Sequence, residues 1–218
     1  YLAKCIIKFI NSLAEKINND PRIDNKIKVV FIENYDVSKA ELIIPAADVS
    51  EQISTTTKEA SGTGNMKLMM NGAITLATLD GANIEIFDQV GEDNIVIFGL
   101  SANEVLNYNK FGGYSALDLY NSNRVIKRVV DDLVNGFIPN MEKEGRQIYD
   151  SLITYNDEYF VLRDMENYIE AQEKIDRLYK NKEKWNEMAL INIANSGVFS
   201  SDRTIAEYAE DIWFKGCE

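Results

Sequence analysis

Histidine is absent from this sequence of 218 residues, and cysteine occurs only twice, at Cys5 and Cys217. Without histidine, the common catalytic triads and the usual metal sites lose a member. Two cysteines are too few for a zinc site or a disulfide framework. We therefore expect no metal site and a reduced, cytoplasmic protein.

Positive charge is also scarce. The chain has 23 Lys and Arg residues against 35 Asp and Glu residues, which gives a formal net charge of −12. A nucleic acid needs clustered Lys and Arg, so we expect no nucleic-acid partner, whereas a neutral polysaccharide is compatible with this charge. Any phosphate must then be bound by local groups.

Long hydrophobic runs are missing as well. Lys4 and Lys8 interrupt the apolar start of the chain, and no small-residue cleavage site follows, which favours a buried amphipathic helix over a signal peptide. No run reaches the roughly 20 apolar residues of a membrane span, so we expect no membrane partner.

Strand and helix patterns alternate in the first half of the chain, which predicts an α/β fold with a right-handed parallel sheet. Ligands of such sheets bind beyond the carboxyl ends of the strands. The expected strands are 28–32, 48–53, 73–79 and 94–98, and the expected helices are 1–18, 38–42, 65–70 and 82–87.

The second half is expected to be helical, with Ser201-Asp202 as the N-cap of the last helix. We expect an α/β half-domain over 1–108 and a helical C-terminal part of the same domain over 109–218. The expected helices of this second part are 124–135, 142–154, 165–180, 182–195 and 204–214.

The segment Gly62–Lys67, Gly-Thr-Gly-Asn-Met-Lys, lies where a polar loop enters a helix. Unpaired N–H groups and the helix dipole stabilise an anion there, and glycine lets it approach the main chain. Lys67 lies in the first turn, and its side chain leans back toward the N-terminus. Pyridoxal phosphate carries both a phosphate and an aldehyde that a lysine can bind as a Schiff base.

Taken alone, this short motif leaves other interpretations open. Gly-x-Gly before a helix is common, and a lysine in a first turn is often a solvated charge. A nucleotide P-loop fits worse because Leu68 follows Lys67 where Ser or Thr is needed, and a dinucleotide fingerprint lacks its third glycine.

The longer string from Glu59 to Lys67, continued by Asn71-Gly-Ala and by Thr78 to Glu85, closely resembles the pyridoxal phosphate segment of the glycogen, starch and maltodextrin phosphorylases. The resemblance implies the C-terminal portion of such an α-glucan phosphorylase, part of a Rossmann-like, GT-B type C-terminal domain. It extends over almost the whole chain, through 31–35, 44–53 and 192–205.

The family's full-length enzymes transfer glucosyl units from an α-1,4-glucan to phosphate and give glucose 1-phosphate. The resemblance thus implies a glycosyltransferase with pyridoxal 5′-phosphate as cofactor and a homodimeric full enzyme. Family members are several-fold longer, and their substrate-phosphate Lys and Arg residues would precede Tyr1, so we expect an inactive fragment. We expect the determinants of glucan preference, allosteric control and oligomeric state to lie mostly upstream of Tyr1.

The resemblance assigns Lys67 as the Schiff-base lysine, an anchor for the cofactor, and places Thr63 and Gly64 at the cofactor phosphate. Tyr35 is expected beside the cofactor, with a buried structural tyrosine as the alternative.

The same resemblance assigns Glu59, Ser61 and Gly62 to the glucosyl unit. A carboxylate accepts short, strong hydrogen bonds from sugar hydroxyls. The alternatives are an exposed loop acid for Glu59 and a turn residue for Ser61.

Other polar residues of the matched string are explained as turn formers, and we expect structural roles for them. The sequence departs from the family at Thr56-Thr57-Lys58, where a small residue and glycine commonly precede the Glu, and at Asp36, where animal enzymes carry a basic residue. The first departure implies a loop with less conformational freedom. The expected structural residues are Asn71, Asp80, Asn83 and Glu85.

A second hypothesis is a non-catalytic folding or interaction module that binds no cofactor. A transaminase-like enzyme is disfavoured because no Asp in a recognisable motif is offered to the pyridinium nitrogen. The last helix is expected to cross to the family's N-terminal domain, which would cover an otherwise unpartnered apolar face. That face consists of Ile205, Tyr208, Ile212 and Trp213.

Overall fold

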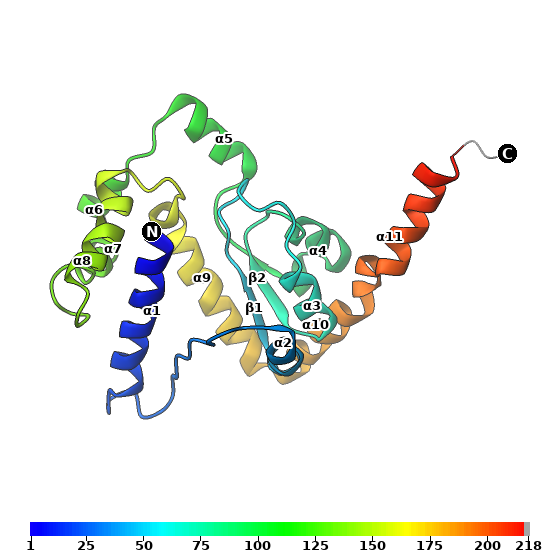
Figure 1. The fold of residues 1–218 in the computed structure, drawn as a ribbon, viewed down its shortest axis with the longest axis horizontal. Coiled ribbons are helices and arrows are strands. Elements are labelled where there is room, and N and C mark those ends of the chain that lie inside the picture. The colour runs from blue at the N-terminus through cyan, green and yellow to red at the C-terminus, as the bar shows by residue number, and fades with distance from the viewer. Residues whose placement is uncertain (216–218) are drawn as a thin grey trace. The chain divides into compact units, whose positions relative to one another are not determined.

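The computed structural model describes residues 1–215 (Figure 1), and Cys217 lies outside them. Contacts divide the chain into two compact units, 1–36 with 111–166 and 37–110 with 167–218. Both parts expected from the sequence, 1–108 and 109–218, contribute elements to each unit, and the division into domains stays a prediction.

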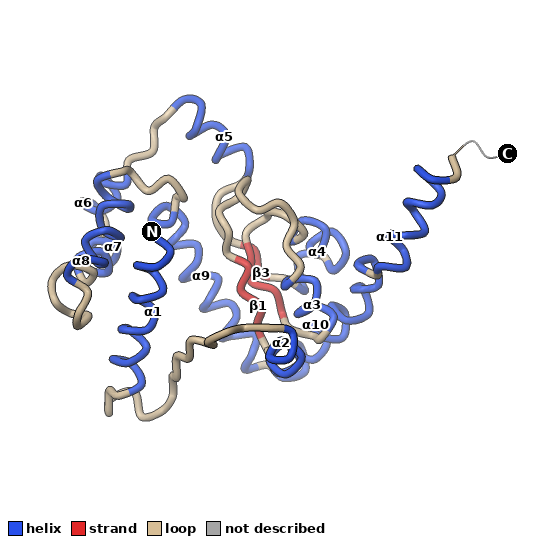
Figure 2. The backbone as a smooth tube through the Cα atoms, viewed as in Figure 1, coloured by secondary structure: helices blue, strands red, loops and turns tan. Residues whose placement is uncertain are grey.

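The second unit contains a parallel sheet of β1 (Val49–Gln52), β2 (Ile74–Ala77) and β3 (Val96–Ile97), in that order. Figure 2 shows the three strands side by side. All four residues of the central strand β2 are buried, as is typical of a parallel strand covered on both faces. The predicted α/β fold with a parallel sheet is confirmed.

Helices pack on this sheet. Trp185 and Met188 of helix α10 lie in one buried cluster with Leu76 and Val96 of the sheet. These aromatic and Met side chains of α10 therefore serve packing. The helices of this unit are α2 (Val37–Ile43), α3 (Gly64–Met70), α4 (Asn83–Val90), α5 (Ala102–Phe111), α10 (Lys182–Asn195), α11 (Ser201–Tyr208) and the later part of α9 (Val161–Lys180).

The first unit is helical. Cys5 is a free, buried thiol that packs with Ile138 and Met141, and the Lys8 ammonium pairs with the Glu144 carboxylate at 2.8 Å. Its helices are α1 (Leu2–Asn18), α6 (Ala116–Ser122), α7 (Arg124–Asp131), α8 (Glu142–Tyr149) with a π turn over Asp150–Thr154, and the start of α9.

The expected buried strand over 28–32 is wrong. The segment is mostly exposed and lies outside the sheet. The Asn18 amide occupies both hydrogen-bonding groups of Val29: Val29 N–H donates to Asn18 Oδ1 at 2.9 Å, and Asn18 Nδ2 donates to Val29 C=O at 2.8 Å. The Asn18 side chain, at the end of α1, thus occupies the main-chain groups of Val29 that a neighbouring strand would bind.

The last helix begins at Ser201, three residues before the expected start at residue 204. Ser200, not Ser201-Asp202, is its N-cap, and the Ser200 hydroxyl accepts a hydrogen bond from Asp202 N–H at 3.3 Å. The apolar residues expected to face another domain, Ile205, Tyr208, Ile212 and Trp213, are exposed. Within residues 1–215, no helix is both long enough and apolar enough to cross a membrane.

A buried hydrogen bond joins Tyr114 to Asp157 in the helical unit. Tyr114 OH and Leu162 N–H both donate to Asp157 Oδ2, at 2.7 and 2.8 Å, and Asp157 is 2% exposed. Burial, reinforced by the negative charge of Asp157, raises the pKa of Tyr114 above its ordinary value.

We expect this bond to give the protein an alkaline pH dependence. An unfolded tyrosine loses its proton near pH ~10, whereas folded Tyr114 keeps it, so the folded state binds more protons and stability falls as the pH rises above about 10. Tyr114→Phe should flatten this fall and cost about 1–3 kcal/mol at neutral pH. Thermal unfolding against pH measures both effects.

Tyr155→Phe is the matched control, because Tyr155 is 76% exposed. It should keep both the stability and the alkaline slope of the parent chain. The same slope in Tyr114→Phe as in the parent would contradict the assignment.

Candidate functional site

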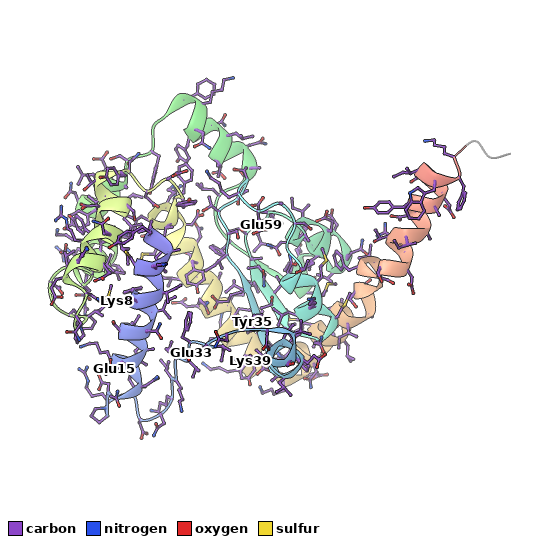
Figure 3. The ribbon with its side chains drawn as sticks, viewed as in Figure 1. Lys8, Glu15, Glu33, Tyr35, Lys39 and Glu59 are labelled. Carbon is purple, nitrogen blue, oxygen red and sulfur yellow. The ribbon has the colours of Figure 1, made fainter. Side chains whose placement is uncertain are left out.

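The Gly62–Lys67 segment lies in the strand, loop and helix order that the sequence predicts. A loop leaves the carboxyl end of β1 and enters α3 at Gly64, and Figure 3 labels Glu59 on this loop. The neighbouring parallel strand β2 ends at the same edge of the sheet. The loops after β1 and β2 therefore meet where α/β sheets bind ligands.

The start of α3 is open to an anion. Thr63 is the N-cap, but its side chain makes no capping hydrogen bond. Gly62 has a φ of +88°, and a Cβ at Gly64 would meet nothing within 4 Å. The Met66 N–H donates to Asn65 Oδ1 at 2.9 Å, so one of the first N–H groups of α3 is occupied, while the Thr63 side chain caps none of them and space adjoins Gly64.

Lys67 is exposed and is the fourth residue of the seven-residue helix α3, in its last turn. Its N–H donates to Thr63 C=O at 3.2 Å, while its own C=O accepts from Asn71 Nδ2 at 2.8 Å. The helix backbone thus fixes the base of the Lys67 side chain, and Asn71 serves the end of the helix, as expected from its structural role.

The residues assigned to the sugar lie on the loop before α3. Glu59 and Ser61 are exposed, and the Glu59 carboxylate accepts a hydrogen bond from Ser54 Oγ at 3.2 Å. The Ser61 hydroxyl lies 3.5 Å from Gly62 C=O, at the limit of a hydrogen bond. Both side chains are therefore accessible to a ligand.

Residues 80–82, which follow β2, hold this loop through its main chain. Asp80 Oδ2 accepts from Lys58 N–H at 3.0 Å and from Glu59 N–H at 2.7 Å. Ala82 N–H donates to Ser61 C=O at 2.8 Å. The approach is so close that a Cβ at Gly81, where φ is +52°, would lie 2.5 Å from Ser61 O.

A buried amide pair extends this hold to α3. Asn65 Nδ2 donates to Asn83 Oδ1 at 3.0 Å, and Asn83 Nδ2 donates to Thr78 C=O at 3.2 Å. The sequence predicts Asn83 as structural and does not single out Asn65. The available signal is the position of Asp80 and Asn83 in the short stretch between a buried strand and the next helix.

Thr57 adopts a backbone conformation that suits glycine. Its φ is +79°, which is unusual for a β-branched residue. The adjacent Thr56 is buried, and its hydroxyl donates to Leu100 C=O at 2.8 Å. The loop therefore keeps a left-handed turn at the place where the phosphorylase pattern commonly has glycine.

Tyr35 belongs to the other unit and is 60% exposed, so the alternative of a buried structural tyrosine does not hold. Its expected place beside a cofactor stays a prediction. In the part of the chain that the structure describes, no group of three or more Cys, Asp or Glu residues could hold a metal ion.

The match to known proteins extends over nearly all of the chain. The family model for carbohydrate phosphorylase matches residues 1–215. The chain belongs to the carbohydrate phosphorylase family.

Three relatives show how far the similarity extends. The glycogen phosphorylase of Bacillus subtilis is 59% identical over 213 residues, which are 98% of this chain and 27% of that protein. The liver form of human glycogen phosphorylase is 48% identical over 98% of the chain, and the Synechocystis glycogen phosphorylase is 49% identical over the same share. The chain spans about a quarter of the length of these relatives.

Gly81 tests the close approach of the two loops. Gly81→Ala should lower stability because the new Cβ strains a positive φ and also forces the Ser61 carbonyl away. Gly136→Ala is the control, since φ is also positive there, at +82°, and a Cβ meets nothing within 4 Å. We expect about 1 kcal/mol of loss for the control and at least about 2 kcal/mol more for Gly81→Ala, measured by urea unfolding. Equal losses would contradict the close approach.

Thr57 tests the strain in the loop. Thr57→Gly should raise the free energy of unfolding by about 1 kcal/mol, because relief of the positive φ outweighs the added backbone entropy. Thr55→Gly, at a neighbouring threonine outside the left-handed region, should lower it. A loss at Thr57 equal to that at Thr55 would show that Thr57 is unstrained.

Proposed function

We propose that this chain is the cofactor-anchoring portion of a pyridoxal phosphate-dependent α-glucan phosphorylase. In the full-length enzyme, a glucosyl unit of an α-1,4-glucan is transferred to phosphate to give glucose 1-phosphate. The observation that carries the proposal is the exposed Lys67 in the short helix α3, three residues after Gly64 at the helix start. Relatives named glycogen phosphorylase support it.

The cofactor fits the residues at this helix start. Lys67 supplies the amine that attaches the aldehyde, and the N–H groups near Thr63 and Gly64 meet the phosphate, with Tyr35 as a further neighbour. Open space at Gly64 and the absence of a Thr63 side-chain cap agree with an anion there. When bound, the cofactor would supply a phosphate that acts beside the substrate phosphate as an acid–base or electrostatic partner.

The sugar is held by the loop before α3. The Glu59 carboxylate accepts hydrogen bonds from sugar hydroxyls, and Ser61 and Gly62 add hydroxyl and main-chain contacts. This chain therefore orients the sugar and anchors the cofactor. Residues from the rest of the enzyme would complete the substrate-phosphate site.

The remaining assignments follow from the same proposal. The sheet and its helices form part of a GT-B type C-terminal domain, and the enzyme is a cytoplasmic homodimer that binds neither nucleic acid nor membrane. The apolar face of α11 covers part of the N-terminal domain. A non-catalytic module is not favoured by the relatives, which are named as phosphorylases.

Removal of the Lys67 amine tests the anchor. The full-length enzyme that carries this chain is reduced with borohydride in the presence of pyridoxal phosphate, and its peptides are mapped. In the parent enzyme, we expect the label on Lys67. Lys67→Ala should carry no label at this position and should no longer form glucose 1-phosphate. Lys174→Ala, at an exposed helical lysine, should behave like the parent.

Two results would contradict the proposal. Normal cofactor content in Lys67→Ala would remove the anchor assignment. Full-length protein that carries the label but makes no glucose 1-phosphate from glycogen and phosphate would overturn the phosphorylase assignment.

A further inference from the structure

We propose that Asp80 is a positioning residue that orients Glu59 toward the sugar. The inference rests on the proposed function, because it gives Asp80 a role in the same sugar site. Asp80 directly follows the β2 region and is 7% exposed, which is unusual for a carboxylate.

The hydrogen bonds of Asp80 determine what it can do. A single oxygen, Oδ2, accepts from the N–H groups of both Lys58 and Glu59, at 3.0 and 2.7 Å. Bonds to an ionised acceptor are stronger than neutral ones. Two successive peptide groups directed at one atom fix the orientation of the main chain at Glu59, and with it the direction in which the Glu59 side chain leaves the loop.

Neighbouring contacts narrow the orientation further. The ideal Cβ position at Gly81 lies 3.0 Å from Glu59 Cγ, so a glycine there leaves room for the Glu59 side chain. Ser54 Oγ donates to Glu59 Oε2 at 3.2 Å, and Thr78 Oγ1 donates to Ser54 C=O at 2.6 Å. Glu59 is thereby held at its main chain and at its carboxylate.

The segment after β2 contacts both halves of the site. Asp80 and Ala82 bind the main chain of the loop that carries Glu59 and Ser61, while Asn83 binds Asn65 at the start of α3. Loss of the Asp80 carboxylate removes its bonds to Lys58 N–H and Glu59 N–H and leaves the Asn83–Asn65 bond in place. Asp80 therefore affects the sugar more than the cofactor.

Its partners show that Asp80 positions the loop and does not take part in the reaction. The carboxylate is buried, and the hydrogen bonds that the structure gives Oδ2 both come from the main chain of the loop. Glu59 is exposed and directly available to a ligand. Asp80 thus acts through Glu59.

Steady-state kinetics of the full-length enzyme carrying this chain test the inference. We expect Asp80→Ala to raise the KM for glucose 1-phosphate and to lower kcat/KM by roughly 10²-fold, the effect of a small misplacement of a binding group. Borohydride-trapped cofactor on Lys67 should stay at the parent level. Asp80→Asn keeps an acceptor oxygen of the same shape and should recover most of the loss.

Asp88→Ala, at an exposed acidic residue of α4, is the matched control and should leave KM unchanged. Amide hydrogen exchange gives a second measurement that needs no activity. Exchange at Lys58 and Glu59 should be at least about tenfold faster in Asp80→Ala than in the parent, with β2 and α3 unaffected.

The outcomes separate this inference from the proposed function. Unchanged exchange at Lys58 and Glu59, or equal loss of sugar affinity and of cofactor in both Asp80 variants, would overturn the positioning role. Exchange at Lys58 and Glu59 could instead be faster in Asp80→Ala while the parent enzyme traps cofactor but makes no glucose 1-phosphate. That result would overturn the proposed function and leave the positioning role intact.

Discussion

The parallel pairing of β1 with β2 is the constraint on which the rest of the site depends. Val49 lies opposite Ile74 and Gln52 opposite Ala77, so the two strands end at the same edge of the sheet. The loop that follows β1 and the turn that follows β2 then meet without further adjustment. A one-residue slip would exchange the side chains that β2 presents to its two covered faces and would displace the two loops by about 3.3 Å along the strands.

The sequence predicts the order of elements in the sheet unit well, because their signals are local. Buried runs of apolar residues mark β2 and β3, and good helix formers after Gly64 mark α3. The strand expected over 28–32 is wrong for a reason that local patterns do not contain: an apolar run becomes a strand only beside a partner. Here the Asn18 side chain occupies the groups that a partner would need. The helices α5 and α6 were not predicted.

The candidate site shows the same limit. Lys67 and the glycines before it stand out as a motif, and Glu59 follows from the longer resemblance. Asp80 and Asn83 are also visible, but only as turn formers, because the N–H groups that Asp80 accepts come from residues about twenty positions earlier. Any residue except proline can donate a main-chain N–H, so the sequence does not show which residues make these long-range hydrogen bonds. Only the fold shows them.

That same use of the main chain has an evolutionary consequence. The hydrogen bond from Lys58 N–H does not depend on the side chain at position 58. Substitutions there can therefore accumulate without breaking the bond to Asp80. Position 80 has less latitude, since one side-chain oxygen there must accept both bonds. The residues of the loop can thus change while its main chain keeps the same path across the sheet edge. The departure from the family pattern at Thr56-Thr57-Lys58 is such a change.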